Sequence, residues 1–349
     1  MSASPLHSTR MRLSGGVDEI SDALFDKGYT DGLPIVPPTE ERVRRMLEGT
    51  SRPSDESLGQ MPPAQFDATV EKIAVNAVMA GCRPEAMPVL IAAVELMLDA
   101  RWDLGYLQTT TNPLTPMLIV NGPIRRSAGL YGGTGAMGPG WRANASIGRA
   151  IRLILLNIGG AAPGDIDKCT QGFVGKFSLC LAENVEESPW TPLHVARGFA
   201  KEDSVITVVG VNASTNIHDS SDRWQDVLKT LTGSLKSPGT ANVADPNSTP
   251  VILVNPLHAK ILDDAGYTME RLREHFFRHA RIDADELSAR RRQLRLDHGE
   301  ENFLVEGRVP LTNAPERILI AVVGGMGGGH SCFLPNGHYG YALSKRIVP

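Results

Sequence analysis

Four short apolar runs rich in β-branched residues constrain the fold more than any other feature of this sequence. Each has the length of a strand, and runs that are apolar throughout are typical of strands buried on both faces. Segments with helical periodicity separate them. The alternation predicts an α/β fold with parallel strand pairs, in which helices flank the sheet. The predicted strands cover residues 117–121, 205–211, 251–255 and 318–323, and the main predicted helices cover 143–158, 222–235, 258–265 and 269–278.

The part of the chain before residue 116 has a different pattern. Residues 69–80 and 84–99 have apolar residues at helical spacing, and we expect these two helices to form an α-helical hairpin. Shorter helices are predicted at 17–27 and 40–47. The expected organisation is therefore a disordered lead (1–16), a helical segment (17–115) and an α/β region (116–349), with a further boundary near 237–250.

Two predicted strands share a short motif. Residues 118–124 read Leu-Ile-Val-Asn-Gly-Pro-Ile, and residues 252–257 read Ile-Leu-Val-Asn-Pro-Leu. Each run delivers an Asn and a Pro at its carboxyl end. This repeat raises the hypothesis that the α/β region consists of two related halves, although unrelated strand ends often look alike.

Composition excludes several classes of partner. The 349 residues carry a net charge of −4, whereas nucleic acids and anionic membranes demand a basic face. No apolar run approaches the roughly 20 residues that span a bilayer, and the polar N-terminus does not have the pattern of a secretory signal. The four cysteines form no CxxC pair, so we expect reduced thiols in a cytoplasmic protein and no structural zinc.

Residues 175–194 hold the densest set of reactive side chains, including Lys176, Cys180 and Glu183. If the segment is helical as far as Ser188, then Cys180, Glu183 and Glu187 share one face. In one interpretation Cys180 is a nucleophile and Glu183 its general base, with Lys176 or His194 lowering the thiol pKa. In a second, Glu183, Glu187 and His194 bind a divalent metal. A polar surface stretch with one buried cysteine is an equally weighted alternative.

A second candidate is the glycine-rich segment 324–332, which follows a predicted strand and ends in His330, Ser331 and Cys332. Backbone N–H groups of such a loop, around Gly328, can converge on an anion. His338 follows and could return to the same site. Because residues 333–337 predict a turn rather than a helix, the loop matches neither the Rossmann fingerprint nor the P-loop.

The third candidate is the loop 129–144, which leads from a strand to a helix N-terminus. We expect Arg142 to pair with an anion, Trp141 to form an apolar wall, and Asn144 to contribute a polar contact. Thr110 offers a hydroxyl just before the same strand. Among the weaker signals, His258 is more typical of a helix start than of a ligand, and Cys169 is taken as an ordinary thiol.

Four stretches resemble one mostly uncharacterised family: residues 69–82, 120–124, 138–144, and 182–190 with Leu193-His194. Its members are often encoded beside a small protein with a UGSC (selenocysteine or cysteine) motif, described as thioredoxin-like. The resemblance covers residues 60–210 well and the rest loosely. It implies a large subunit that pairs with a small redox-active or nucleophilic partner. Because this chain has no Gly-Cys-Gly-Ser-Cys element, such a nucleophile would come from the partner.

These observations lead to one main functional expectation and two alternatives. We expect an oligomeric enzyme or large enzyme subunit that acts on a small anionic substrate by thiol- or metal-assisted lyase or redox chemistry at a carbon–heteroatom bond. One alternative is a non-catalytic scaffold for the small redox-active partner. The other is a nucleotide-binding enzyme that uses its glycine-rich loops. A divalent metal is the one cofactor that the residues suggest.

Overall fold

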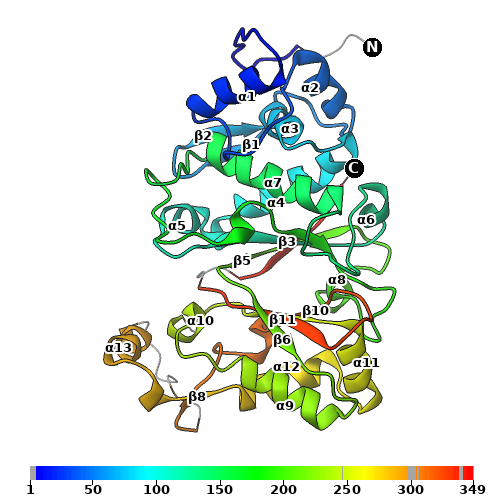
Figure 1. Ribbon diagram of the computed structural model, residues 1–349, viewed down its shortest axis with the longest axis vertical. Helices are drawn as coiled ribbons and strands as arrows, with labels where there is room; N and C mark the ends of the chain where they lie inside the picture. The colour runs from blue at the N-terminus through cyan, green and yellow to red at the C-terminus, as the bar shows by residue number, and fades with distance from the viewer. Residues whose placement is uncertain (1–4, 246, 298–303, 305, 338–340, 349) are drawn as a thin grey trace.

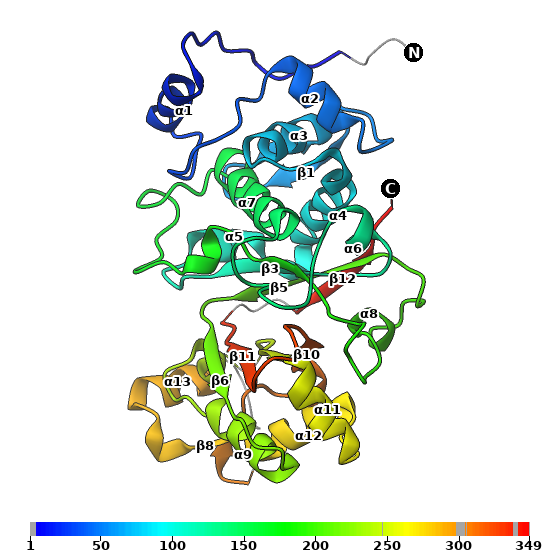
Figure 2. The ribbon, with the colours of Figure 1, turned by 45° about the vertical axis from the view of Figure 1, so that its right-hand side comes forward.

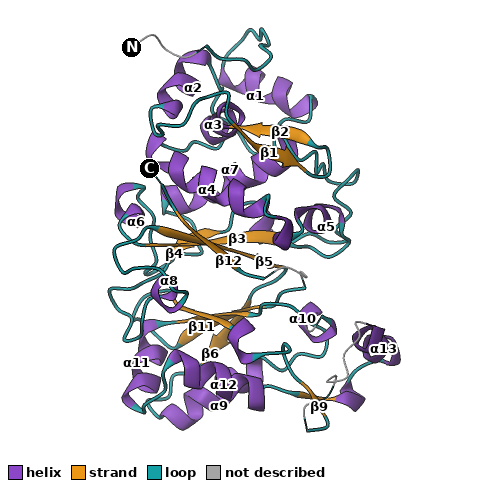
Figure 3. Ribbon diagram, turned by 180° about the vertical axis from the view of Figure 1, so that it is seen from behind, coloured by secondary structure: helices purple, strands orange, loops and turns teal. Residues whose placement is uncertain are grey.

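The computed structural model describes residues 5–245, 247–297, 304, 306–337 and 341–348. Two four-stranded sheets lie face to face in the middle of the molecule, and helices cover the outer face of each (Figure 3). The N-terminal helices lie beyond one sheet and α9, α11 and α12 beyond the other (Figure 1). No helix in the described ranges is long and apolar enough to cross a bilayer.

The first sheet has the strand order β12-β5-β3-β4. Strands β3 and β4 are parallel, whereas β5 is antiparallel to β3 and to β12. The prediction of parallel pairs is therefore confirmed here for one pair, within a mixed sheet. The strands are β3 (Thr115–Asn121), β4 (Cys180–Ala182), β5 (Val205–Val211) and β12 (Leu343–Arg346).

The second sheet has the order β10-β7-β11-β6. Strands β7 and β10 are parallel, and β11 is antiparallel to both β7 and β6. The turn expected after Cys332 is wrong, because residues 330–334 form a strand that pairs on both sides. The strands are β6 (Thr215–His218), β7 (Val251–Val254), β10 (Leu319–Val322) and β11 (His330–Leu334).

The two sheets match strand for strand. Read from the parallel edge, β4-β3-β5-β12 has the same order and directions as β10-β7-β11-β6. In each sheet the edge strand opposite β4 or β10 comes from the other half of the chain: β6 directly follows β5, and β12 follows β11. Asn212 follows β5 and Pro335 follows β11, so both lie where the chain passes from one sheet to the other. The N–H of Asn212 donates to the carbonyl of Pro335 at 3.1 Å. The halves thus exchange their edge strands.

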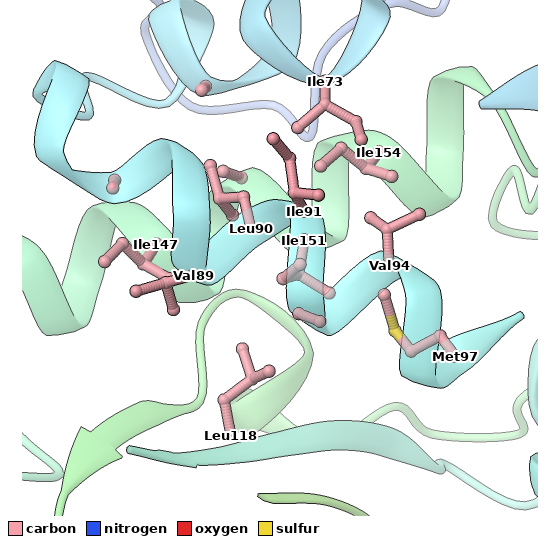
Figure 4. Close-up of a cluster of buried hydrophobic side chains, with 14 of the residues drawn as sticks. Ile73, Val89, Leu90, Ile91, Val94, Met97, Leu118, Ile147, Ile151 and Ile154 are labelled. Carbon is pink, nitrogen blue, oxygen red and sulfur yellow. The ribbon is translucent and has the colours of Figure 1, made fainter. Parts of the chain in front are cut away.

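Helices of the N-terminal part pack on the first sheet and share its core. Figure 4 shows side chains of α3, α4 and α7 meeting above Leu118 of β3. Thr69 and Thr39 begin α3 and α2 by accepting hydrogen bonds from the N–H groups of Lys72 and Arg42. The helices are α1 (Val17–Asp26), α2 (Glu40–Leu47), α3 (Val70–Met79), α4 (Met87–Met97), α5 (Leu104–Thr109), α6 (Ile124–Ser127) and α7 (Arg142–Asn157).

Two segments differ from the sequence-based expectation. The stretch 51–63, which resembles a linker, contributes β1 (Ser57–Met61) to an antiparallel hairpin with β2 (Phe66–Thr69). The lead expected to be disordered is tied down in part: the N–H groups of His7 and Ser8 donate to the buried carboxylate of Glu71 at 2.7 and 2.9 Å. A buried anion needs such partners, so the lead completes the core beneath it.

In the second half, α9, α11 and α12 pack on the outer face of the second sheet, with Phe276 and Phe333 fully buried between the helices and the sheet. Helix α13 lies to one side of this half, and strand β8, which pairs with β9, lies below it (Figures 1 and 2). These elements are α8 (Leu193–Ala196), α9 (Trp224–Ser234), α10 (Ala241–Ala244), α11 (Pro256–Asp264), α12 (Met269–His279), α13 (Ala289–Asp297), β8 (Ile282–Asp283) and β9 (Arg308–Val309).

Candidate functional site

The three segments singled out in the sequence meet at the carboxyl ends of β4 and β10. Gly132 lies so close to the end of β4 that a Cβ there would be 2.5 Å from the carbonyl oxygen of Ala182. The N–H of Gly324 donates to the carbonyl of Gly132 at 2.8 Å. Gly325 abuts the side chain of Thr134. The loop 129–140, the residues after β4 and the loop 324–329 therefore form one region at the junction of the two halves.

Glu183 is the central acidic group of this region. It follows β4 directly and is 1% exposed. Its Oε2 accepts hydrogen bonds from Nδ2 of Asn121, at the end of β3, and from the N–H of Leu193 at 2.8 Å. Burial outweighs these contacts and raises the pKa of Glu183 to about 7. The carboxyl group can therefore both give and take a proton near neutral pH.

Arg125 lies beside Glu183 and links it to the surface. Its Nη1 donates to the backbone carbonyl of Glu183 at 2.9 Å, and its Nη2 to the carboxylate of Glu186 at 2.7 Å. This Arg125 contact is also the main reason why the pKa of Glu186 is held down at about 2. Two buried atoms in the cluster, Nε of Arg125 and Oδ1 of Asn121, have no hydrogen-bond partner among the residues that the structure describes. Such orphaned polar atoms are costly and mark a place where a ligand or water can bind.

The expected helix across residues 180–188 is wrong, because this segment is strand β4 followed by an irregular loop. Successive side chains of a strand point to opposite faces. Cys180 and Ala182 therefore face the core beneath α7, whereas Leu181 faces the second sheet. Glu183 follows on the side of Leu181, so Cys180 and Glu183 do not form a thiol–base pair. Burial in the apolar core also raises the pKa of the Cys180 thiol far above its usual range.

The three expected metal ligands are each engaged elsewhere. Glu187 accepts a hydrogen bond from Nδ2 of Asn184 at 2.6 Å, and Nε2 of the buried His194 lies 3.2 Å from the carbonyl of Lys201. Within the described ranges, no three His, Cys, Asp or Glu side chains are grouped so that they could hold a metal ion. The geometry therefore gives the metal interpretation no support.

Asn144, Trp141 and Arg142 hold the loop 129–140 in shape rather than pointing into an open site. Nδ2 of Asn144 donates to the carbonyls of Tyr131 and Ala136, and its Oδ1 accepts from the N–H of Tyr131. The Trp141 ring stacks on Tyr131 with centroids 3.7 Å apart. The guanidinium of Arg142 is bound to the carbonyl of Gly81. These contacts fix Gly132 against β4.

Two expected substrate-binding residues lie away from this region, by the amino ends of β3 and β4. Lys176 donates to the carboxylate of Asp167 at 2.6 Å and lies 3.3 Å from the sulfur of Cys169. The hydroxyl of Thr110 accepts from the N–H of Asn112. Strand direction explains the separation, because Lys176 precedes β4 whereas Glu183 follows it.

The loop 324–329 covers a second polar cluster at the end of β7. Nδ1 of the buried His258 lies 2.8 Å from the hydroxyl of Ser331, and its Nε2 lies 2.9 Å from the carbonyl of Asp219. Nδ2 of Asn255 donates to the carbonyl of Gly328 at 2.8 Å. Burial lowers the pKa of His258, which keeps the imidazole neutral near pH 7.

The remaining residues of this segment differ in their surroundings. His330 is exposed and stacks on His218 of the neighbouring strand, with ring centroids 4.4 Å apart. Cys332 faces the space between the sheets, where burial raises its thiol pKa to about 11. His338 lies outside the described residues. Cys332 is therefore a poor nucleophile in this conformation.

A groove of about 390 Å³ opens beside the junction. Its walls come from the loop after β4, from one side of α11 along its whole length, and from the loop after β10. Four of its lining side chains are acidic and one is basic. Lys260 pairs with Asp264, and Glu186 pairs with Arg125 and Arg126, so it is mainly Glu187 and Asp263 that make the groove favour a cationic group over an anionic one. Its lining residues are Glu186, Glu187, Ser188, Pro189, Pro256, Lys260, Asp263, Asp264 and Met326.

Asn121 and Arg125 belong to these polar clusters although they were not among the residues expected at a site, and so does His258, which was interpreted as a helix-start residue rather than a ligand. The signal was present in the repeated motif, because each copy places an Asn at a strand end and a basic residue shortly after it, Arg125 in one and His258 in the other. Ligand sites of α/β sheets lie at such carboxyl ends.

Searches against protein-family models, curated proteins and solved structures found no match to this chain. The family resemblance therefore rests on the four sequence stretches alone.

Proposed function

We propose that this protein is an enzyme that uses Glu183 as a general acid and base at the junction of its two halves. The observation that carries the proposal is the nearly complete burial of Glu183, which brings its pKa to about 7. A strongly shifted carboxyl group in a polar crevice at strand ends is typical of acid–base catalysis. Because Cys180 faces away, thiol chemistry at this residue is not part of the proposal.

The chemistry that fits is the removal of a proton next to a carbon–heteroatom bond, as in a lyase. Glu183 would take the proton, with Asn121 holding its Oε2 in place through Nδ2. Nε of Arg125, which has no partner, is available to donate to an oxygen atom that gains negative charge in the reaction. The Arg125–Glu186 ion pair connects this site to the groove and must shift for a substrate to enter.

The lining of the groove changes the expected class of substrate. Glu187, Asp263 and Asp264 line it together with Glu186, and Lys260 is its one basic residue. A small molecule with an amino group fits this charge better than the anionic substrate expected from the sequence.

An infrared titration tests the role of Glu183. We expect the absorption of a protonated buried carboxyl group to disappear with a midpoint near pH 7, and to be absent from Glu183→Gln. Small amines and carboxylates are then screened for a rise in melting temperature. Mass spectrometry follows the stabilising compounds for product. Glu183→Gln should keep binding and lose turnover; turnover equal to that of the unchanged protein would refute the proposal.

A second candidate function is that of a large subunit which binds a small partner, as the family resemblance implies. Val174 and Phe177, in and beside the short 3₁₀ turn Val174–Lys176, are 77% and 51% exposed. Exposed large apolar side chains close together are typical of interaction surfaces. Native mass spectrometry of the chain with a small UGSC-motif protein is the test. A complex that is lost with V174D and F177D, but kept with F66D on the β1–β2 hairpin, supports it; absence of any complex refutes it.

A further inference from the structure

The Cys169 and Lys176 side chains form a close pair on the segment between α7 and β4. Nζ of Lys176 lies 3.3 Å from Sγ of Cys169. Asp167 holds both residues: its Oδ2 accepts from Nζ of Lys176 at 2.6 Å, and its Oδ1 accepts from the N–H of Cys169 at 3.1 Å. The ammonium and the thiol are therefore fixed next to one another by a carboxylate that is itself buried.

Cys169 differs from the other three cysteines in its surroundings. Burial raises the thiol pKa of Cys82 to about 12 and that of Cys332 to about 11, and raises that of Cys180 further. Cys169 is partly exposed and lies beside the cations of Lys176 and Arg152. Thiols that react with oxidants are accessible and lie close to positive charge.

A small cavity lies next to this pair. Its polar lining consists of Gln108, Thr115, Arg152, Asp167 and Lys176, and its volume of about 20 Å³ accepts a molecule about the size of water. Gln108 is 3% exposed, and its Oε1 has no hydrogen-bond partner. The cavity therefore offers cationic donors and one free acceptor, which suits a small neutral molecule that both donates and accepts hydrogen bonds.

We propose that Cys169 and Lys176 are a peroxide-responsive pair that closes into a covalent sulfur–nitrogen bond. In the first step the Cys169 thiolate attacks hydrogen peroxide: an S–O bond forms, the O–O bond breaks, and the released hydroxide takes up a proton to leave as water. The product is a sulfenic acid. The sulfur has lost two electrons and the peroxide has gained them.

In the second step the neutral amine of Lys176 attacks the sulfenic sulfur. An S–N bond forms, the S–O bond breaks, and the oxygen leaves as a second water. The proton that the ammonium must lose passes to Asp167 or to solvent. The sum is one thiol, one amine and one peroxide giving one sulfenamide and two waters. The fixed position of the amine favours this ring closure over attack by an external thiol.

Peptide mass spectrometry after treatment with hydrogen peroxide and alkylation of the remaining thiols tests the pair. We expect a product that has lost two hydrogen atoms, with Cys169 joined to Lys176, no tryptic cleavage after Lys176, and reversal by dithiothreitol. Cys169 should react at least about tenfold faster than Cys82, Cys180 and Cys332, as its exposure and cationic neighbours require.

Two variants separate the steps. Lys176→Arg keeps the cation but cannot condense, so Cys169 should accumulate as a sulfenic acid that dimedone traps. Lys168→Arg, at the neighbouring exposed lysine, is the matched control and should still form the bond. Faster oxidation of another cysteine, or direct passage of Cys169 to sulfinic acid without the loss of two hydrogens, would overturn the proposal.

Discussion

Asn121 and Glu183 meet at the carboxyl ends of the parallel strands β3 and β4, where Nδ2 of Asn121 donates a hydrogen bond to the Glu183 carboxylate. The contact joins the two residues on which the proposed acid–base chemistry depends. It also supports the ionised form of Glu183, while burial opposes that form more strongly.

The contribution of Glu183 to stability should fall as pH rises from about 4.5 to about 7, in opposition to His275, whose pKa of about 4 makes its own contribution rise over much of the same window. The pKa of Glu183 is about 7 in the folded state against 4.5 in the reference state, so the folded protein binds more protons in this window. The loss in the free energy of unfolding that Glu183 causes is absent below pH 4.5, complete above pH 7, and amounts to about 3 kcal/mol. Urea denaturation at pH 5, 6, 7 and 8 measures the free energy of unfolding, and the difference from the profile of Glu183→Gln gives the contribution of Glu183.

Glu183→Gln should remove this part of the pH dependence, because the amide resembles the protonated carboxyl group. Glu187→Gln is the matched control: it changes a neighbouring carboxylate but keeps Glu183, so its profile should run parallel to that of the unchanged protein. Parallel profiles for all three proteins would show that Glu183 does not titrate in this range.

Gly132→Ala should destabilise the protein by about 1–3 kcal/mol and displace the loop 129–140. An added Cβ would lie 2.5 Å from the carbonyl of Ala182, a backbone atom that cannot turn aside. Gly138→Ala, in the same loop, has its nearest neighbour at 3.5 Å and should be close to neutral. Thermal denaturation gives the melting temperatures of both variants. Equal values would contradict the tight packing of Gly132 on β4.

Cys180→Ala should cost about 1–2 kcal/mol of stability and leave catalysis intact. The side chain is 4% exposed in the core beneath α7, so its removal leaves a small cavity. Chemical denaturation gives the cost, and turnover of any substrate found in the screen gives the second readout. Loss of turnover with a native melting profile would restore the nucleophile hypothesis for Cys180.

Leu343→Asp should weaken the first sheet although it lies near the end of the second half. Leu343 is 8% exposed, belongs to the core of the first sheet, and pairs with Val208 of β5. We expect hydrogen exchange of β5 to rise while β7 is protected as before. Val348→Asp, at a residue 71% exposed, is the control and should leave both strands unchanged.

The strands of the α/β region could be predicted because runs such as 117–121 and 251–255 are apolar at nearly every position. A strand has this pattern when both of its faces are covered by other layers of the fold. The site was predicted in part. Glu183 was identified from a dense polar segment, but a helical reading placed Cys180 beside it. The two residues are three positions apart, a spacing that puts side chains on the same face of a helix and on opposite faces of a strand.

The antiparallel pairs and the distant position of Lys176 could not be read from the sequence. Both depend on which strands are neighbours, and neighbourhood in a sheet leaves no periodic trace in either strand. The same holds for the pairing of Cys169 with Lys176, which lie seven residues apart on an irregular segment and are brought together by the shared carboxylate of Asp167.

The exchange of β6 and β12 has a consequence for biosynthesis. The first sheet lacks its edge strand until residues 343–346 leave the ribosome, although β3, β4 and β5 are made much earlier. Until then the backbone of β5 is open along one side, a state that promotes pairing with other nascent chains. The first half of this protein is thus finished by a strand that is synthesised after every strand of the second sheet, and a ribosome-stalled fragment without β12 would need a chaperone to shield that edge.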